Sequence, residues 1–364
     1  MAKKKVLLIF GGRSAEHEIS VLSAGMVYNA IDKELYELIL VGITRKGDWF
    51  LFSPDIFSQN DELFSLSPTD ERVVLMSDDG RPNVTIFGEH VSHIPVDVAL
   101  PILHGPYGED GTIQGLFKMA NLPFVGPGVL SSSVAMDKEV MKRLMEHGEV
   151  PVVPYQVLRA GDTRGELESC FHELGPVLFV KPSNMGSSVG VSRVESVDEL
   201  ANAIEYAFRF DNKVLIEKGV EGKEVEVGVL GNNQRREVSV VGQVIPSEEH
   251  GFYSYDSKYI DESGALLLIP APLSEAEAER VKELALKATA LLEIEGMARV
   301  DSFVQEDGRV LINEINTIPG FTPISMYPSL WEAWGKPYTE LLDDLLQLAL
   351  ARHERDSLLS CEGG

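Results

Sequence analysis

The segment Gly296–Gly320 constrains the fold more than any other part of this 364-residue chain. It contains two runs rich in branched apolar residues, Met297–Val304 and Arg309–Asn316. Between the runs lies Asp307-Gly308, a dipeptide favoured in two-residue type I′ turns. The pattern predicts an antiparallel β-hairpin, and a two-residue turn at this dipeptide would fix its register.

In that register four polar side chains share one face of the hairpin. Asp301 lies opposite Glu314, and Arg299 lies opposite Asn316. Directly opposed carboxylates repel one another, but with an amide beside them they form a hard oxygen ligand set that suits Mg²⁺. The neighbouring guanidinium suits a phosphate or an oxyanion. The alternative is a solvated polar face, which is common in antiparallel sheets.

Composition places the chain among ordinary soluble globular proteins of two or three domains, with 44% hydrophobic and 24% charged residues. We expect no membrane partner, because no run approaches the roughly 18 apolar residues of a membrane span. The first apolar run is too short for a signal peptide. Cys170 and Cys361 have no metal-binding spacing, which favours a reduced, cytoplasmic setting. The net charge of −25 argues against general binding to nucleic acid.

Strands and helices alternate along residues 1 to about 125, as in a doubly wound α/β sheet. Val6–Phe10, Leu38–Ile43 and Val96–Leu100 are predicted strands, and Ser14–Ile31 is a predicted helix with Ser14 as its N-cap. Residues 52–95, rich in Asp, Ser and Pro, are predicted to form an irregular insertion or hairpin.

The rest of the chain is predicted to be mixed α and β. Its expected elements are helix Met136–His147, strands Val177–Lys181, Val189–Val194, Val214–Glu217 and Glu224–Leu230, a helix from Ser274 to about Leu292 opened by a Ser274–Glu277 capping box, and helix Tyr338–His353.

Residues 181–190 form a loop of small residues between two strands. Such residues allow backbone N–H groups to approach an anion closely, and Lys181 at the strand end could reach a phosphate. The loop is not a P-loop, because it lacks GxxxxGK[ST] and a strand follows it. A flexible turn is the alternative interpretation.

Four further stretches could carry chemistry. Glu217 follows an apolar strand and could hold an adenine amine and ribose, although a plain strand exit is the alternative. Glu16, at the start of the first helix, could take a ligand ammonium or only complement the helix dipole. His104 and Glu109 lie in a predicted rigid turn, which displays them for a functional role or is only a structural loop. Residues 252–259 suit a lid, or a surface loop packed by its tyrosines.

The order of the motifs resembles that of D-alanine–D-alanine ligases, members of the ATP-grasp superfamily. The motifs, in chain order, are GGRSAEHEIS, HGPYGEDG, MDKEVMK, FVKPSNMGSSVGVS, IEKGVEGKEVE, FYSYDSKY, GMARVDSF and LINEINTIPGFTPISMYP. The resemblance covers nearly the whole chain. It implies a Rossmann-like N-terminal substrate domain (1–130), a central ATP-grasp subdomain (131–221) and a C-terminal subdomain with the metal site and lid (222–364).

The resemblance also implies roles for individual residues. The metal ligands for two Mg²⁺ or Mn²⁺ ions would be Asp301, Glu314 and Asn316. The first D-alanine, its reacting carbonyl and the second D-alanine would be held by Glu16, His104, Arg299, Gly320, Ser325 and Met326. The residues around ATP would be Lys138, Lys181, Ser187, Ser188, Glu217, Lys218, Val220, Glu224, Lys258, Asn313 and Glu314.

The implied reaction is phosphorylation of one D-alanine by ATP, followed by attack of a second D-alanine on the acyl phosphate. Arg299 and the N–H of Gly320 would stabilise the oxyanion, and Lys258 would reach the transferred phosphoryl group. A Glu16–Ser187–Tyr259 hydrogen-bond group would close the lid. Tyr259 favours dipeptide over depsipeptide formation.

Three other hypotheses remain to be distinguished. The second substrate could be D-lactate or D-serine, or the chain could be a non-enzymatic nucleotide-binding protein. The missing GxGxxG disfavours a Rossmann dehydrogenase. The resemblance further implies a homodimer that acts in the cytoplasm, on small molecules only, to supply peptidoglycan synthesis.

Overall fold

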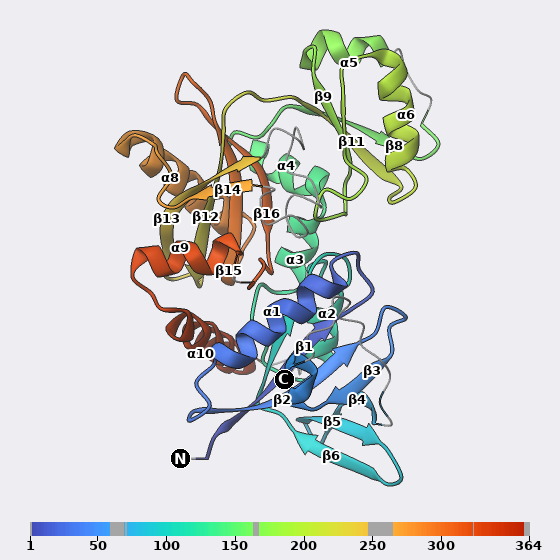
Figure 1. Cartoon of the computed structure of the whole chain (residues 1–364), viewed down its shortest axis with the longest axis vertical. Coiled ribbons are helices and arrows are strands. Elements are labelled where there is room, and N and C mark those ends of the chain that lie inside the picture. The colour runs from blue at the N-terminus through green and yellow to red at the C-terminus, as the bar shows by residue number, and fades with distance from the viewer. Residues whose placement is uncertain are drawn as a thin grey trace.

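Three β-sheets flanked by helices make up the chain (Figure 1). The computed structural model describes residues 2–58, 69, 71–162, 167–246, 265–322 and 324–359. The sheets follow one another along the sequence, so each of the three predicted segments contains one. The boundaries after residues 130 and 221 stay predictions.

The N-terminal sheet has seven strands in the order β6-β5-β4-β3-β2-β1-β7. β1 pairs in parallel with β2 and β7, whereas β3 to β6 extend the sheet in antiparallel fashion. Of the two predictions for residues 52–95, an irregular insertion or a hairpin, the described residues favour the second, because β4, β5 and β6 form consecutive antiparallel hairpins. The strands are β1 (Lys4–Gly11), β2 (Tyr36–Ile43), β3 (Trp49–Phe52), β4 (Arg72–Asp78), β5 (Arg81–Phe87), β6 (Val91–Pro95) and β7 (Val98–Ile102), with a 3-10 turn at Pro54–Ser58.

Helices cover both faces of the parallel strands, as a doubly wound sheet requires. Even-numbered residues of β1, such as Leu8, share a core with helix α1 (His17–Ala30). Odd-numbered residues, such as Ile9, share a core with α2 (Thr112–Met119). The predicted N-cap was wrong: Glu16 holds that position, and Ser14 Oγ instead accepts a hydrogen bond of 3.0 Å from the Glu16 N–H.

The helix predicted at residues 136–147 is present but begins two residues later, and a separate helix that was not predicted precedes it. α3 (Val129–Met136) ends at Asp137, whose backbone is extended, and α4 (Lys138–His147) begins after it. The Asp137 side chain caps α4 by accepting a hydrogen bond of 3.1 Å from the Val140 N–H. The break gives α4 a polar start facing the central sheet, with Lys138 as its first residue.

The central sheet has four strands in the order β10-β9-β11-β8, with helices packed against it. The strand predicted at Val189–Val194 is much shorter, because positive φ angles at Ser187, Ser188 and Gly190 keep that stretch in a loop. The elements are β8 (Tyr155–Arg159), α5 (Leu167–Leu174), β9 (Leu178–Pro182), β10 (Ser192–Val194), α6 (Val197–Ala207) and β11 (Lys213–Lys218).

The C-terminal sheet has five strands in the order β14-β13-β12-β15-β16. Helix α8 packs on one face with the predicted Ser274–Glu277 capping box in place, and α9 packs on β12 and β13. The elements are β12 (Lys223–Gly231), β13 (Arg236–Pro246), β14 (Ala265–Leu268), α8 (Glu275–Leu291), β15 (Gly296–Val304), β16 (Val310–Asn316), α9 (Met326–Trp334) and α10 (Tyr338–Ser357).

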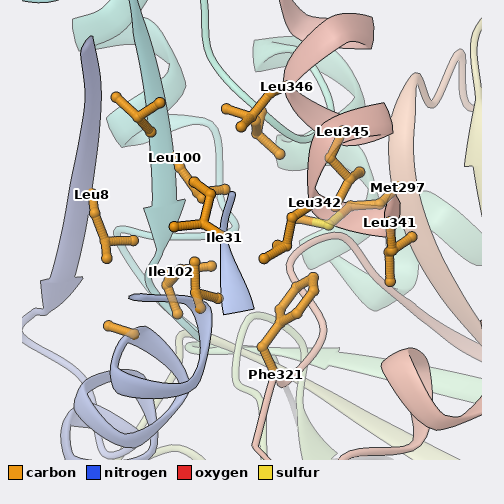
Figure 2. Close-up of a cluster of buried hydrophobic side chains, with 14 of the residues drawn as sticks. Leu8, Ile31, Leu100, Ile102, Met297, Phe321, Leu341, Leu342, Leu345 and Leu346 are labelled. Carbon is orange, nitrogen blue, oxygen red and sulfur yellow. The ribbon is translucent and has the colours of Figure 1, made fainter. Parts of the chain in front are cut away.

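One apolar cluster joins the two ends of the chain. Leu341, Leu342, Leu345 and Leu346 of α10 pack with residues of β1 and β7 and with Phe321 (Figure 2). The core of the central sheet is a separate cluster. The N-terminal and C-terminal sheets are therefore held together by shared apolar burial, whereas the central sheet has its own core.

Within the described ranges, none of the helices has the length and apolar character needed to cross a membrane.

Candidate functional site

The predicted pairing of the β15–β16 hairpin is confirmed, but the predicted turn was wrong. Asp301 pairs with Glu314, and Arg299 pairs with Asn316. The turn has three residues, 306–308, because the Gln305 N–H donates to the Arg309 carbonyl oxygen at 2.9 Å. Gly308 supplies the positive φ of 79° that such a turn needs.

A β-bulge at Asn313 restores the predicted register. Near the turn Ser302 pairs with Ile312, whereas beyond the bulge Asp301 pairs with Glu314. Asn313 is the extra residue, so Asn313 and Glu314 are both left partly exposed between the buried Ile312 and Ile315. The longer turn and the bulge each shift the pairing by one residue in opposite directions, and the two shifts cancel.

A cleft of about 350 Å³ is lined by residues of the central and C-terminal sheets. Every residue expected around ATP that the structure describes lines it. These are Lys138, Lys181, Ser187, Ser188, Glu217, Lys218, Val220, Glu224, Asn313 and Glu314. Phe179, Met185, Gln243 and Phe303 also line it, and the sequence analysis missed them.

Two lysines share one buried carboxylate at the back of the cleft. Glu217 lies 3.0 Å from Lys142 Nζ and 2.6 Å from Lys181 Nζ. Burial by itself raises the pKa of Glu217, but the two ammonium groups outweigh it and lower that pKa. Burial likewise lowers the pKa of Lys181, but nearby carboxylates, first Glu217 and then Glu314, raise it overall. Glu217 and Lys181 are therefore charged at neutral pH, whereas burial lowers the pKa of Lys142.

The N-terminus of α4 brings a third lysine to the cleft. Lys138 Nζ donates to the Met185 carbonyl oxygen at 2.7 Å and lies 3.3 Å from Glu314 Oε2. Lys138 and Lys181 thus face the same cleft from different elements. The loop between β9 and β10 carries Ser187 and Ser188 at positive φ, an uncommon backbone state that occurs often at ligand sites.

The carboxylate pair on the hairpin is surrounded by nitrogen donors. Arg299 Nε and a terminal nitrogen donate to the two oxygens of Asp301 at 2.8 and 2.7 Å. Asn316 Nδ2 donates to Asp301 Oδ2 at 3.0 Å. Lys138 forms an ion pair with Glu314, as Arg299 does with Asp301. Cations therefore neutralise the two opposed carboxylates in this structure.

The donor set fits divalent metal ions by its chemistry. Asp301 and Glu314 offer carboxylate oxygens from adjacent strands, and Asn316 offers an amide oxygen on the same face. Among the described residues no three His, Cys, Asp or Glu side chains cluster as a metal site. The expected ligand set needs only two such side chains with one amide.

The loop after β1 contributes a carboxylate, Glu16, which contacts the lining of the cleft. Glu16 Oε1 accepts a hydrogen bond from Ser187 Oγ of the central loop. A Cβ at Gly105 would lie 2.5 Å from Glu16 Oε2, so this glycine leaves the space that the carboxylate occupies. The expected Glu16–Ser187 pair is therefore present, whereas Tyr259 and Lys258 lie outside the described residues.

His104 and Glu109 are buried, not displayed as predicted. The His104 imidazole contacts the Ile318 carbonyl oxygen at 2.9 Å through Nδ1 and Ser23 Oγ at 3.3 Å through Nε2. Burial lowers the pKa of His104 and keeps it neutral. Glu109 accepts hydrogen bonds from the N–H groups of Gly105 and Ile318, both at 2.8 Å. Both side chains thus fix the loop that follows β16.

That loop carries Gly320 and leads to the helix start expected to hold a carboxylate. Ser325 occupies the N-cap position of α9, a helix the sequence analysis missed, and Met326 is its first residue. Ser325 Oγ accepts a hydrogen bond of 2.9 Å from the Thr322 N–H and lies close to Gly320. A helix N-terminus favours an anion because its first N–H groups and its dipole point outward.

Two further site residues were not assigned from the sequence. Lys142 lies four residues after Lys138 in MDKEVMK, a spacing that places both on one side of α4. Glu226 follows Glu224 by two residues in β12, which places both on one face of the strand. Both spacings can be read from the sequence, so they could have identified Lys142 and Glu226 as site residues.

Two family models match the chain: D-ala D-ala ligase N-terminus at residues 5–127 and D-ala D-ala ligase C-terminus at residues 144–347. The D-alanine–D-alanine ligase of Shouchella clausii is 46% identical over 99% of this chain and 98% of its own length.

Solved structures are similar over the same extent. The D-alanine-D-alanine ligase of Coxiella burnetii superposes with a TM-score of 0.86 and 34% identity, covering 98% of this chain and 97% of its own. The VanG D-Ala:D-Ser ligase of Enterococcus faecalis has a TM-score of 0.84 and 33% identity, covering 96% and 100%. The expected ATP-grasp fold is confirmed by these neighbours. Sequence, fold and site geometry agree, and the chain belongs to the D-alanine–D-alanine ligase family.

Proposed function

We propose that the chain catalyses the ATP-dependent ligation of two D-alanines to D-alanyl-D-alanine, a dipeptide used in peptidoglycan precursors. The observation that carries the proposal is the meeting of three parts at one cleft. These parts are the lysines beside Glu217, the opposed carboxylates of the hairpin and the Glu16–Ser187 pair.

The first step transfers the γ-phosphoryl group of ATP to the carboxylate of the first D-alanine. Lys138 and Lys181 bind the phosphates, and Glu217 with β11 and β12 holds the adenosine. Asp301, Glu314 and Asn316 would hold two Mg²⁺ or Mn²⁺ ions, which neutralise phosphate charge when bound. The products of this step are ADP and an acyl phosphate.

The second step forms the peptide bond. Glu16 and His104 hold the first D-alanine, and the α9 N-terminus at Ser325 and Met326 holds the carboxylate of the second. Its amine attacks the acyl carbon, the carbonyl oxygen becomes an oxyanion beside Arg299 and the Gly320 N–H, and phosphate leaves with loss of the amine proton. Lys258 and Tyr259 belong to this proposal as lid residues.

The deciding experiment measures phosphate release with ATP, Mg²⁺ and D-alanine, with products resolved by mass, in the presence and absence of excess D-lactate or D-serine. D-Ala–D-Ala as the dominant product in every mixture is the expected result. A dominant mixed product would mean that D-lactate or D-serine, not D-alanine, is the second substrate. That outcome would be in keeping with the structural likeness to a D-Ala:D-Ser ligase. No D-alanine-dependent phosphate release would overturn the proposal.

A homodimer, a cytoplasmic location and the domain limits 1–130, 131–221 and 222–364 are also part of the proposal. They rest on the family resemblance. Sedimentation of the purified protein at several concentrations tests the dimer.

A further inference from the structure

The loop that follows β16 is buried on both sides of Gly320. Residues 317–319 and 321–322 are all buried, whereas Gly320 between them is partly exposed. Ile318 and Phe321 belong to the apolar cluster that joins the two ends of the chain. The loop is therefore anchored immediately before and immediately after its one partly exposed residue.

The backbone N–H groups of this loop follow the same pattern. The Ile318 N–H donates to Glu109 Oε1 at 2.8 Å, and the Phe321 N–H donates to Ser23 Oγ at 3.2 Å. Residue 319 is a proline and has no N–H to donate. Among the residues that the structure describes, no acceptor is bonded to the Gly320 N–H. This N–H is therefore the donor of the loop that a ligand could use.

Both acceptors come from the N-terminal part of the chain. Ser23 lies on α1 and is 0% exposed, and Glu109 lies in the turn after β7 and is 8% exposed. Glu109 Oε2 accepts the Gly105 N–H at 2.8 Å, which ties the carboxylate to its own turn. Burying a hydroxyl or a carboxylate is costly unless it is hydrogen-bonded, so packing alone does not explain these two side chains.

The proposed reaction needs a fixed donor in this loop. The Gly320 N–H and Arg299 are the expected donors to the oxyanion of the second step, and such donors act best when they are held in place before the charge develops. We propose that Ser23 and Glu109 are positioning residues: they hold the N–H groups on either side of Gly320 and thereby fix its own N–H for the oxyanion. The inference rests on the proposed function, which supplies the oxyanion.

The test compares the binding of two compounds in the presence of ADP, by calorimetry. One is a phosphinate analogue of D-alanyl-D-alanine, whose tetrahedral phosphorus carries an anionic oxygen in place of the peptide carbonyl, and the other is the dipeptide itself. Ser23→Ala should lower the preference for the phosphinate, expressed as the ratio of the two Kd values, by about 10- to 100-fold. The kcat should fall by a similar factor, with the KM for ATP unchanged. An unchanged preference would overturn the inference.

Ser20 offers a matched control on the same helix. It is also 0% exposed, and its Oγ accepts the Gly11 N–H at 2.7 Å and donates to the Ile102 carbonyl oxygen, away from the loop after β16. Ser20→Ala should lower the melting temperature and keep the wild-type preference for the phosphinate. An equal loss of preference in Ser20→Ala and Ser23→Ala would mean that the role of Ser23 is only structural, and the inference would fail.

Glu109→Gln tests the second acceptor independently of α1. The amide replaces one of the two accepting oxygens by a donor that faces an N–H group, so the preference for the phosphinate should fall here too. The binding is measured at pH 8, above the pKa of Glu109 of about 7, so the wild-type carboxylate is ionised. Wild-type preference in Glu109→Gln would overturn the inference. Wild-type protein that prefers the phosphinate but forms no dipeptide would instead count against the proposed function alone.

Discussion

At the scale of single residues, several buried charges of the site are paired with opposite charges. Glu217 lies between two lysines, and Lys138 and Arg299 neutralise the hairpin carboxylates. An unpaired buried charge costs several kcal/mol, so this pairing is what lets so many charged groups be buried together.

The metal assignment can be tested at Glu314. Glu314→Gln keeps the size of the side chain but removes one of the two carboxylates, so we expect at least about a hundred-fold loss of kcat, corresponding to roughly 3 kcal/mol or more. The fold should survive, because the residue is partly exposed. Steady-state turnover and a thermal melt check this, and near-normal turnover would refute the assignment.

Glu109 should make stability depend on pH. Burial and the neighbouring Glu16 carboxylate raise its pKa from 4.5 to about 7. The folded chain therefore binds a proton more tightly than the unfolded chain. The resulting stabilisation is complete below about pH 4.5 and is lost as the pH rises through about 7, by on the order of 3 kcal/mol.

Urea unfolding of the wild-type chain and of Glu109→Gln at several pH values isolates this contribution. Between pH 5 and pH 8 the unfolding free energy of the wild type should fall relative to that of Glu109→Gln, because the amide does not titrate. A difference that stays constant with pH would contradict the assignment of the raised pKa to this group.

At the scale of elements, the cap of α4 links stability to the cleft. Asp137 accepts the Val140 N–H and is 2.6 Å from Lys213 Nζ of β11, so it joins the helix start to the central sheet. Lys138 is the next residue. The position of its ammonium group therefore depends on how Asp137 holds the first turn.

Asp137→Ala should lower stability by about 1 kcal/mol from the lost cap, and somewhat more from the lost ion pair. It should also raise the KM for ATP several-fold, with little change in the KM for D-alanine. Ser274→Ala is the control, since it removes the capping box of α8 away from the cleft. The control should lose stability and keep its KM for ATP; equal KM changes would dismiss the link.

At the scale of the whole molecule, the chain has a shared core for its two ends and a separate core for its middle. α10 packs against the N-terminal sheet, so residues more than 300 positions apart share one apolar cluster (Figure 2). The central sheet has its own apolar cluster, in which Leu178, Val180 and Leu200 are buried.

This difference predicts two kinds of core mutant. Leu342→Ala should cost about 2–5 kcal/mol and lower the transition seen by tryptophan fluorescence, because Trp49, Trp331 and Trp334 all lie in the N-terminal and C-terminal parts. Ile204→Ala in the central core should lower a calorimetric transition and leave the fluorescence transition almost unchanged. Equal shifts in both signals for both variants would mean a single cooperative unit.

Features that depend on local pattern and on motif order could be predicted from the residues alone. The pattern of apolar residues predicted β1, β15 and β16. The capping box predicted the start of α8, and the ordered motifs identified the family. The pairing of Asp301 with Glu314 was also predicted, although from a two-residue turn that does not exist. These features need only neighbours along the chain or one adjacent strand.

The tertiary structure alone decided which distant side chains meet. The bulge at Asn313 depends on the pairing of β15 with β16, and the place of Glu226 beside Arg299 depends on the pairing of β12 with β15. The burial of His104 and Glu109 depends on their contacts with the loop after β16. Sequence periodicity records only which face of a strand or helix is apolar. It cannot record which buried charge will find a partner, because that partner comes from a part of the chain brought close only by folding.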